Sequence, residues 1–581
     1  MQTIGEWLTS IKQAIATQGD AAGALAAVDA AALAPWIAFR PAERHRAVVY
    51  RDADLEIVVV GWSAGNTSGW HDHGDAQCAF ALVSGELVEV RDDGARVLAI
   101  GRPVEVPLGV RHDVRCPRGV AVTVHAYRRP LGLGRVGPAA TDADVVVIGG
   151  GASAAALVLA LRGRATALVV EPSGALGLGI AYRAAREHRL NVPAARMSIL
   201  DGAPDHFFDW CRRADPTTAP SDFVSRAAYA DYLRDTLAIE ADPRVTVVPA
   251  RAVDARRERG GWAITLHDGR VLTARACVLA TGHAAPTPLA PEVEVAWPAD
   301  QVVVQPHEDV LIIGLGLTFL DVFASLRAQG HRGRITAFSR RGRLPAPHAA
   351  GTTTVRLAAE PAPVATLVAR VRAAAAEAHR RGEPWQAVLD QARAHAPAWW
   401  AALDEAERAR FLRHVRPAWE VHRHRAPPDA LAQVAAAQAG GTLEQLAARW
   451  GGVTRAEGRL QVTLHTEAGP VTRSVDRVLQ ANGGDDARRG GFGLHATLAT
   501  RGTIRLDPSG LGISADSNGV ALDRDGAATG PWLIGPALRA DRFEATAIPE
   551  IRAQAAALAD ALAAKLTHPR PPAATTAVAK P

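Results

Sequence analysis

The sequence lacks any block of like charge with aromatic residues between the charges, a pattern common on nucleic-acid-binding surfaces. It also has very little lysine, which occurs only at Lys12, Lys565 and Lys580. The 65 basic residues, nearly all arginine, are balanced by 60 acidic ones, so the net charge is only +5. We therefore expect no nucleic-acid partner.

Cysteine is scarce as well. The four cysteines are far apart and form no CxxC pair: Cys78, Cys116, Cys211 and Cys277. With no secretory leader, this favours a reducing cytoplasm and argues against a redox-active disulfide relay of the thioredoxin-reductase type. The longest uncharged stretch, Val145 to Leu161, is slightly short for a membrane span, so we expect no membrane partner.

At 581 residues the chain is too long for one hydrophobic core, and its length indicates about three domain-sized units. Residues 1 to about 40 have apolar residues at helical spacing and predict helices. From Ala47, short β-rich runs such as AVVYRDADLEIVVVGW and VAVTVHAY are separated by turns, which predicts an all-β barrel or sandwich. From Ala143, buried strands precede glycine turns and helices, the pattern of an α/β dinucleotide-binding fold.

These changes of pattern predict a multidomain chain whose oligomeric state the sequence leaves open. The expected parts are a β-barrel domain with N-terminal helices at 1–130, a linker at 131–142, a flavoprotein at 143–566 and a disordered tail at 567–581. Within the flavoprotein we expect an FAD part at 143–300 and 470–566, an NAD(P) part at 301–356 and an Ala/Arg-rich helical insertion at 357–450.

Histidines and one cysteine cluster between two predicted strands of the β-rich region. Their spacing is specific: Gly65, His71, His73, Cys78 and Gly85, then Gly101, Pro107, Gly109 and His112. This pattern resembles both halves of the cupin signature, except that cupins usually have a glutamate ligand where Cys78 stands here. Three neutral imidazoles would leave a divalent metal its full charge and open positions for a substrate and O₂ together.

The exchange of glutamate for cysteine points to one family. From about Ala42 to Pro130 the chain resembles cysteine dioxygenase, a mononuclear non-haem iron enzyme. The resemblance implies that His71, His73 and His112 bind Fe(II), and that a small thiol and O₂ are the reactants.

The same resemblance implies roles for four further residues. Cys78 and Tyr127 would become cross-linked, and Thr123, His125 and Tyr127 would match a Ser-His-Tyr set, with threonine in place of serine. Strand alternation puts these last three side chains on one face.

The family also holds the substrate carboxylate with an arginine about 25 positions before the first ligand. Arg46 fits this position best, and Arg51 is the alternative because the intervening loop could shift the alignment. A guanidinium suits a carboxylate better than an ammonium does.

Each of these residues also has a plainer interpretation. A His-x-His pair can lie on the surface or in the core without binding a metal. Cys78 can be a small buried apolar residue, and His125 can be a core histidine with its hydrogen bonds made within the protein. Arg46 could form a surface salt bridge. The combined spacing favours the metal site over these interpretations.

A first nucleotide turn follows the predicted strand DVVVIG. Gly149-x-Gly151-x-x-Ala154 opens a helix, and Glu171 ends the next strand, 22 residues after Gly149. Glycines allow a tight turn and close approach of a pyrophosphate to the helix N-terminus. An acid at this position favours a ribose without a 2′-phosphate, as in FAD or NAD.

A second nucleotide site follows. CVLATGHAAP, which contains Thr281 and Gly282, looks like the Ala-Thr-Gly element of flavoproteins with two dinucleotide-binding folds. Gly314-x-Gly316 then begins the second turn. Arg340 and Arg341, after the next strand, suit the 2′-phosphate of NADPH, although they could also be solvated turn residues, with NADH as the alternative cofactor.

From about Asp144 to Leu566, segments including EPSGALGLGIAY, LNVPAARMSI and FEATAIPEIRAQ resemble the FAD/NAD(P)-binding family related to flavin N-monooxygenases. The whole sequence therefore predicts a bifunctional oxidoreductase. Its cupin would convert cysteine or a related thiol to the sulfinate, and its flavoprotein would carry out an FAD- and NADPH-dependent oxidation. The alternatives are a metal-binding cupin that senses or docks substrate for the flavin enzyme, and a flavin that reduces the iron.

Overall fold

The computed structural model describes most of the chain beyond residue 44. The described residues are 45–51, 55–68, 77–91, 93–107, 110–128, 141–182, 186–239, 242, 244–284, 286–484 and 493–567. The predicted N-terminal helices, most of the linker and nearly all of the predicted disordered tail lie outside these ranges. The chain divides into two compact units, Met1–Ala139 and Ala140–Pro581, which are described in turn.

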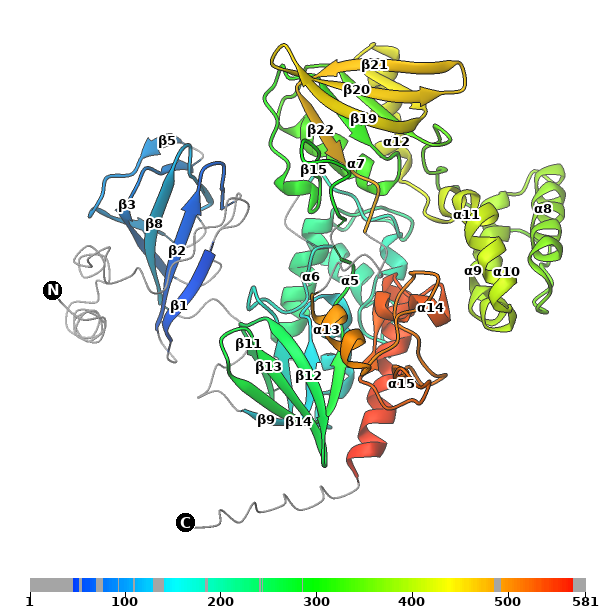
Figure 1. Cartoon of the computed structure of the whole chain (residues 1–581), viewed down its shortest axis with the longest axis horizontal. Helices are drawn as coiled ribbons and strands as arrows, with labels where there is room; N and C mark the ends of the chain where they lie inside the picture. The colour runs from blue at the N-terminus through cyan, green and yellow to red at the C-terminus, as the bar shows by residue number, and fades with distance from the viewer. Residues whose placement is uncertain are drawn as a thin grey trace. The chain divides into compact units, whose positions relative to one another are not determined.

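The first unit is built from two antiparallel sheets, which confirms the all-β region predicted from the short alternating runs (Figure 1). A five-stranded sheet has the order β1-β2-β8-β3-β6, and a three-stranded sheet has the order β5-β4-β7. The strands are β1 His45–Arg51, β2 Leu55–Ser63, β3 Gln77–Ser84, β4 Val88–Arg91, β5 Gly94–Val97, β6 Pro103–Val106, β7 His112–Arg115 and β8 Val120–Arg128.

The core of the first unit lies between these two sheets. Strand β8 runs between β2 and β3, and Val58, Phe80 and His125 are opposite one another across the three strands. Trp62 of β2 and Leu87, next to β4, belong to the same buried cluster as Val58 and Phe80. This face of β8 therefore looks into the interior, where polar side chains can be held away from water.

The second unit begins with a seven-stranded sheet of the order β11-β10-β9-β14-β13-β12, with β23 beside β14. Strands β11, β10, β9, β14 and β23 are parallel, and β12 and β13 form an antiparallel extension. The strands are β9 Asp142–Ile148, β10 Ala167–Val170, β11 Val245–Val248, β12 Ala252–Glu258, β13 Gly261–Leu266, β14 Val271–Leu279 and β23 Trp532–Leu533.

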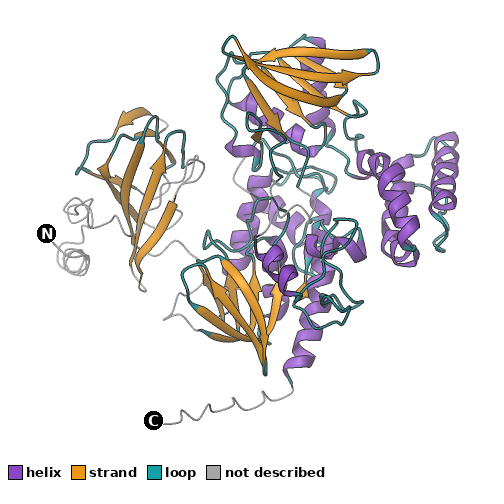
Figure 2. Ribbon diagram, in the orientation of Figure 1, coloured by secondary structure: helices purple, strands orange, loops and turns teal. Residues whose placement is uncertain are grey.

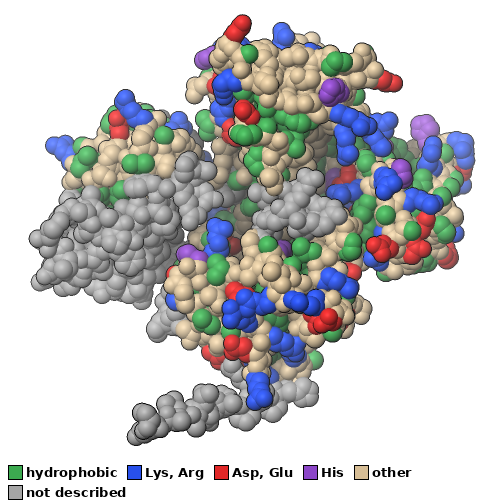
Figure 3. Space-filling model, viewed as in Figure 1, with side chains coloured by type: hydrophobic (Ala, Val, Ile, Leu, Met, Phe, Trp, Pro, Cys, Tyr) green, Lys and Arg blue, Asp and Glu red, His purple; other side chains and the backbone are tan. Residues whose placement is uncertain are grey.

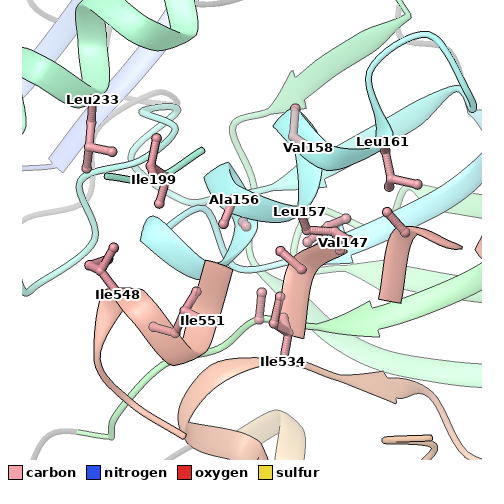
Figure 4. Close-up of a cluster of buried hydrophobic side chains, with 14 of the residues drawn as sticks. Val147, Ala156, Leu157, Val158, Leu161, Ile199, Leu233, Ile534, Ile548 and Ile551 are labelled. Carbon is pink, nitrogen blue, oxygen red and sulfur yellow. The ribbon is translucent and has the colours of Figure 1, made fainter. Parts of the chain in front are cut away.

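Helices from both ends of the unit cover this first sheet. They are α4 Ala152–Leu161, α5 His206–Ala214, α6 Arg226–Ile239, α13 Gly493–Arg501, α14 Arg539–Arg542 and α15 Ile548–Leu566, with short helices η2 Ala194–Arg196 and η6 Gly535–Leu538. Figure 4 shows Leu157 of α4, Val147 of β9, and Ile534 and Ile551 near the chain's end converging in one buried cluster. The C-terminal segment thus completes the core that the first strands begin.

A second parallel sheet has the order β15-β22-β16-β17-β18, and an antiparallel sheet, β19-β20-β21, follows it. The elements are β15 Glu294–Val295, η3 Ala299–Gln301, β16 Val310–Ile313, α7 Leu317–Ala328, β17 Ile335–Ser339, β18 Leu443–Ala447, β19 Arg449–Ala456, β20 Arg459–Thr466, β21 Gly469–Val475 and β22 Arg477–Gln480. Together the two parallel sheets give the predicted α/β fold with two dinucleotide-binding parts.

The division between these parts differs from the predicted one. Because β22 pairs with β16, the second parallel sheet includes residues beyond 470, and the chain returns to the first sheet only after about residue 481. Strand β15, within the predicted FAD range, also belongs to the second sheet.

The predicted helical insertion is helical over a shorter range, 364–439 (Figure 2). Its helices are α8 Val364–Arg380, α9 Trp385–Ala402, α10 Glu405–Arg410, the π-helical turn η4 Phe411–Val415, α11 Arg416–Arg423 and α12 Pro428–Ala439. Residues 443–450, the end of the Ala/Arg-rich stretch predicted to be helical, instead form β18 and the start of β19, because β18 pairs with β17. Among the described helices, none has the length and apolarity needed to cross a bilayer.

Candidate functional sites

His112 begins strand β7 and is almost wholly buried, with 1% of its surface exposed. Its Nδ1 atom lies 2.7 Å from Oε1 of Glu89, a fully buried carboxylate on the neighbouring strand β4. A carboxylate on one ring nitrogen fixes the tautomer, so that Nδ1 carries the proton and Nε2 is the atom suited to a metal. His112 therefore has the support typical of a histidine ligand.

Glu89 is held in its charged form by its neighbours. Burial alone would raise its pKa, but hydrogen bonds from His112, Arg96 and Arg91 lower the pKa to about 2. Arg91 Nε is 3.0 Å from Oε1, and Arg96 Nε is 2.7 Å from Oε2. Sequence reasoning missed Glu89, although an acid inside the apolar run ELVEV is a signal, because buried acids need partners.

The other predicted iron ligands, His71 and His73, lie outside the described residues, as do the side chains of Arg46 and Arg51. The backbones of both arginines lie in β1. Within the described part of the chain, no three His, Cys, Asp or Glu side chains gather as a metal site requires. Of the three predicted ligands, His112 is thus the one whose surroundings the structure describes. Its buried imidazole, with a carboxylate partner at Nδ1, fits a metal ligand.

Cys78 on β3 and Tyr127 on β8 lie directly opposite each other in the antiparallel register. Both are buried, with 4% and 6% of their surfaces exposed. Residues in such a pair point to the same face, with Cβ atoms about 4.5–5.5 Å apart. The structure therefore brings together the two residues for which a cross-link is predicted.

Thr123, His125 and Tyr127 lie on one face of β8 and form a hydrogen-bonded chain with Trp62. Trp62 Nε1 donates to Thr123 Oγ1 at 2.8 Å, and Thr123 Oγ1 is 2.8 Å from His125 Nε2. Tyr127 OH lies 3.4 Å from His125 Nδ1. Because an indole N–H only donates, Thr123 Oγ1 accepts from Trp62, and its own hydrogen can be donated to His125 Nε2. In that arrangement the imidazole proton is on Nδ1, toward Tyr127.

Phe80 connects this chain to the candidate ligand. Its ring stacks on His125 with centroids 5.0 Å apart and planes 13° apart, and its centroid is 5.9 Å from that of His112. Phe80 is itself completely buried. The aromatic ring thus keeps water from the space around both imidazoles, where hydrogen bonds and charges act more strongly than in water.

The first nucleotide turn has the geometry that its glycines predict. Gly149 has φ +102°, and a Cβ there would lie 2.4 Å from the carbonyl oxygen of Ala280. Gly151 caps the N-terminus of α4, in which Ala154 is fully buried. Glu171 follows β10 and accepts a hydrogen bond from the Gly150 N–H at 2.8 Å, so the predicted acid lies at the turn.

Gly535 approaches the same turn from the other end of the unit. Gly535 has φ +72°, and a Cβ there would be 2.3 Å from Ser153 Oγ. The sequence analysis did not predict this contact. Its only signal in the sequence is that Gly535 lies between the last strand, β23, and the last helix, α15.

The second turn repeats the first. Gly314 has φ +115°, and a Cβ there would lie 2.5 Å from the carbonyl oxygen of Ala481. Gly316 caps α7, and a Cβ at Gly316 would meet nothing within 4 Å, which leaves room for a pyrophosphate at the helix N-terminus. The two turns therefore fit two dinucleotides.

Thr281 and Gly282 lie at the start of the segment that leaves the first sheet. Thr281 Oγ1 is 3.0 Å from Nε2 of His495 on α13, and Gly282 has φ +72°. Gly282 and His495 both line a large cavity, together with Gly314 and Gly316. The element thus lies where the two nucleotide-binding parts meet.

This cavity has a volume of about 1160 Å³. That is more than the roughly 300–1,000 Å³ of an ordinary ligand pocket, so it can hold more than one ligand. Arg340 lines it, whereas Arg341 is not among the described lining residues. Arg343, which sequence reasoning missed, takes its place, because Gly342 turns the chain with φ +58°.

The helical insertion also contributes to the cavity wall. Arg416, Glu420 and His424 line it from α11 and the residue just after it, together with Arg539 and Glu544 of the C-terminal segment, and Arg539 Nη2 donates to Glu420 at 2.9 Å. Sequence reasoning missed these residues, although the dense His and Arg content of RPAWEVHRHR within an Ala-rich stretch was a signal. Over the drawn face of the second unit, basic and acidic side chains are interspersed (Figure 3).

Two family models match separate parts of the chain. Residues 11–96 match the family described as cysteine dioxygenase type I, and residues 146–284 match a family described as FAD-NAD(P)-binding. The first match begins earlier than the predicted resemblance and ends before His112, and each match covers less than half of the chain. Comparison with curated protein sequences gives no match.

Solved structures resemble the chain in fold. They include an ornithine N-hydroxylase of Kutzneria sp. 744, with 15% identity and a TM-score of 0.53, covering 73% of this chain and 100% of that one. The reduced ornithine hydroxylase of Pseudomonas aeruginosa has 15% identity and a TM-score of 0.51, covering 73% and 99%. The L-lysine 6-monooxygenase of Pseudomonas syringae has 16% identity and a TM-score of 0.50, covering 73% and 100%. At these identities the likeness establishes the flavoprotein fold.

Proposed function

We propose that the first unit catalyses the Fe(II)- and O₂-dependent oxidation of a small thiol, cysteine or a related thiol acid, to its sulfinate. The observation that carries this proposal is the direct opposition of Cys78 and Tyr127 next to the Thr123–His125 hydrogen bond. The match of residues 11–96 to cysteine dioxygenase type I supports it. We further propose that the second unit performs an FAD- and NADPH-dependent oxidation.

The residues that would hold iron are His71, His73 and His112. Iron held by three imidazoles would have open positions for a thiolate and O₂. Glu89 would fix the His112 tautomer so that Nε2 is the nitrogen suited to iron, and the buried Phe80 limits water around the ring.

Tyr127 and His125 would position the substrate and hold a proton. With the imidazole proton on Nδ1, His125 donates toward the Tyr127 oxygen, and the Tyr127 hydroxyl hydrogen is then available to a substrate atom. Arg46, or Arg51 in its place, would hold the substrate carboxylate through a guanidinium fork.

In the second unit, the Gly149–Gly151 turn, Glu171 and the Thr281–Gly282 element would bind FAD, and the Gly314–Gly316 turn would bind NADPH. Arg340 and Arg343, both lining the large cavity after β17, suit the 2′-phosphate of NADPH. When bound, the two cofactors would supply hydride transfer from the nicotinamide to the flavin, and the residues of the two turns would hold the two dinucleotides.

Thiol-dependent oxygen uptake tests the first part of this proposal. Iron-loaded full-length protein is supplied with cysteine and related thiols, with and without NADPH, and the products are identified by mass spectrometry. We expect sulfinate formation without NADPH and its loss in His112→Ala, whereas His307→Ala, a change of an exposed histidine, should retain it. If none of the thiols causes oxygen uptake, the proposed dioxygenase activity is refuted. If NADPH oxidation requires metal in the first unit but no sulfinate forms, the sensor alternative is favoured.

A further inference from the structure

On one wall of the large cavity, two arginines and a histidine share a single carboxylate. Glu420 Oε1 accepts from Arg416 Nε at 3.1 Å and from Arg539 Nη2 at 2.9 Å, and its Oε2 lies 2.5 Å from His424 Nδ1. One carboxylate thus serves two guanidiniums and an imidazole. All four of these side chains line the cavity.

Neighbouring arginines are paired differently. Arg393 makes a two-pronged contact with Glu550, with both distances 2.7 Å, and Arg423 is 2.7 Å from Glu544. Arg425 is 2.5 Å from Asp390. Each of these buried arginines has its own carboxylate, as burial of a charge requires. Among these described pairs, two guanidiniums share one carboxylate oxygen only at Glu420, on the surface that faces the cavity.

His283 is neutral mainly because it is buried, and the nearby Arg539 is a smaller cause. It lines the cavity from the segment after the Thr281–Gly282 element. Burial and the positive charges of Arg539 and His424 lower its pKa to about 4, against a smaller opposite effect of Glu420. A neutral imidazole at this position leaves the positive field of the arginines available to an anion.

The wall is also rigid. Phe543 has φ +51°, a strained value for a non-glycine residue, and stacks on Trp400 with centroids 4.8 Å apart. Phe411, in the π-helical turn ahead of α11, packs edge-on against Phe543 at 5.0 Å. Trp419 Nε1 donates to Glu544 at 3.1 Å. Strained residues and π-turns concentrate at functional sites, and here they pack together the chain segments next to Arg416 and Arg539.

We propose that the flavin unit binds a small organic acid whose carboxylate or sulfinate group is held by Arg416 and Arg539 at this wall. The proposal rests on the proposed flavin function and names its substrate class. The two guanidiniums offer more N–H donors than Glu420 accepts, in the forked geometry that suits a two-oxygen anion. The cavity volume leaves space for such an acid beside a dinucleotide. The proposed substrate and product of the first unit, a thiol acid and its sulfinate, belong to the same chemical class.

Equilibrium titration of the full-length, FAD-loaded protein tests this inference. His112→Ala is used as the background, so that the first unit does not consume thiols. The probes are cysteine sulfinate, 3-mercaptopropionate and cysteamine, which lacks an acid group, and the readout is the change in the flavin absorption spectrum. We expect both acids to bind and the amine to give no change.

Variants separate the arginine contact from general effects. Arg416→Gln should weaken acid binding about tenfold or more, and Arg416→Lys should restore part of it. Arg413→Gln changes an exposed arginine in η4, the turn just before α11, and this variant should bind the acids as the parent protein does. Glu420→Gln should tighten acid binding, which gives an independent readout if Arg416→Gln loses FAD.

Cysteamine binding as tightly as the acids would overturn the inference, and so would Arg416→Gln and Glu420→Gln both binding acids as the parent does. The inference also fails if Arg416→Gln lowers FAD retention while acid binding stays unchanged, because the arginine would then serve the flavin. Failure of the parent protein to bind FAD or oxidise NADPH would instead refute the proposed flavin function.

Discussion

Cys78 and Tyr127 face each other across strands β3 and β8, both buried in the core between the two sheets of the first unit. They are far apart in the sequence, and only the antiparallel register makes them neighbours. The register also places Phe80 opposite His125 and Leu82 opposite Thr123. One strand pair therefore aligns the predicted cross-link with the hydrogen-bonded chain of polar residues.

This opposition predicts a thioether between the two side chains in protein isolated after turnover with iron and a thiol. Intact and peptide mass spectrometry should show a loss of two hydrogen atoms in a peptide pair that contains Cys78 and Tyr127. Cys78→Ser and Tyr127→Phe should each lack the linked peptide. A linked peptide found equally in either variant would contradict the assignment.

Glu89 should determine how well the first unit holds iron. Glu89→Gln removes the carboxylate that orients His112, and we expect iron affinity to fall about 10–100-fold. Glu86→Gln is the matched control, because Glu86 pairs with the exposed Arg118 at the surface. Iron content after dialysis against graded chelator measures the effect. Equal iron retention in the two variants would show that Glu89 does not support a ligand.

The Thr123 hydroxyl should matter for turnover more than for thiol binding. Thr123→Val keeps the shape but removes the group between Trp62 and His125, and we expect kcat for thiol oxidation to fall roughly tenfold to a hundredfold. Thr123→Ser should retain most of the activity. Steady-state oxygen uptake separates kcat from KM, and similar kcat values for the two variants would remove Thr123 from the mechanism.

Much of this arrangement follows from local sequence patterns. Alternating apolar runs predict the strands of the first unit. Glycines at fixed spacing predict both nucleotide turns, because the backbone there has a positive φ and a Cβ atom would clash with a neighbouring carbonyl oxygen. Gly149 and Gly314 show this most directly, at 2.4 Å and 2.5 Å from the oxygens of Ala280 and Ala481. Such constraints act within a few residues and are therefore visible in the sequence.

Other features depend on distant contacts and escape sequence reasoning. Glu89 becomes the partner of His112 only when β4 and β7 pair, and Arg416 meets Arg539 only when the insertion packs on the C-terminal segment. Residues 443–447, LEQLA, have helix-forming composition but are held as a strand by β17, so tertiary pairing overrides local preference. The replacement of Arg341 by Arg343 in the cavity follows from the turn at Gly342.

The arginines after β17 should set the preference for NADPH. Arg340→Ser and Arg343→Ser should each raise KM for NADPH about tenfold and leave KM for NADH nearly unchanged, because a charged contact to the 2′-phosphate is lost. Arg341→Ser, next to both but not among the described lining residues, is the control. Steady-state oxidation of the two nucleotides measures this, and an equal effect of all three changes on NADH and NADPH would argue against a 2′-phosphate site.

Isotope labelling of the thiol product gives the sharpest check on the first unit's chemistry. Iron-loaded full-length protein is incubated with cysteine under ¹⁸O₂ in the absence of NADPH, and the sulfinate is analysed by mass spectrometry. We expect both sulfinate oxygens to carry the label, since a dioxygenase transfers both atoms of O₂ to sulfur. Product with one oxygen from water, or a sulfinate that forms only when NADPH is present, would contradict thiol dioxygenation by this unit.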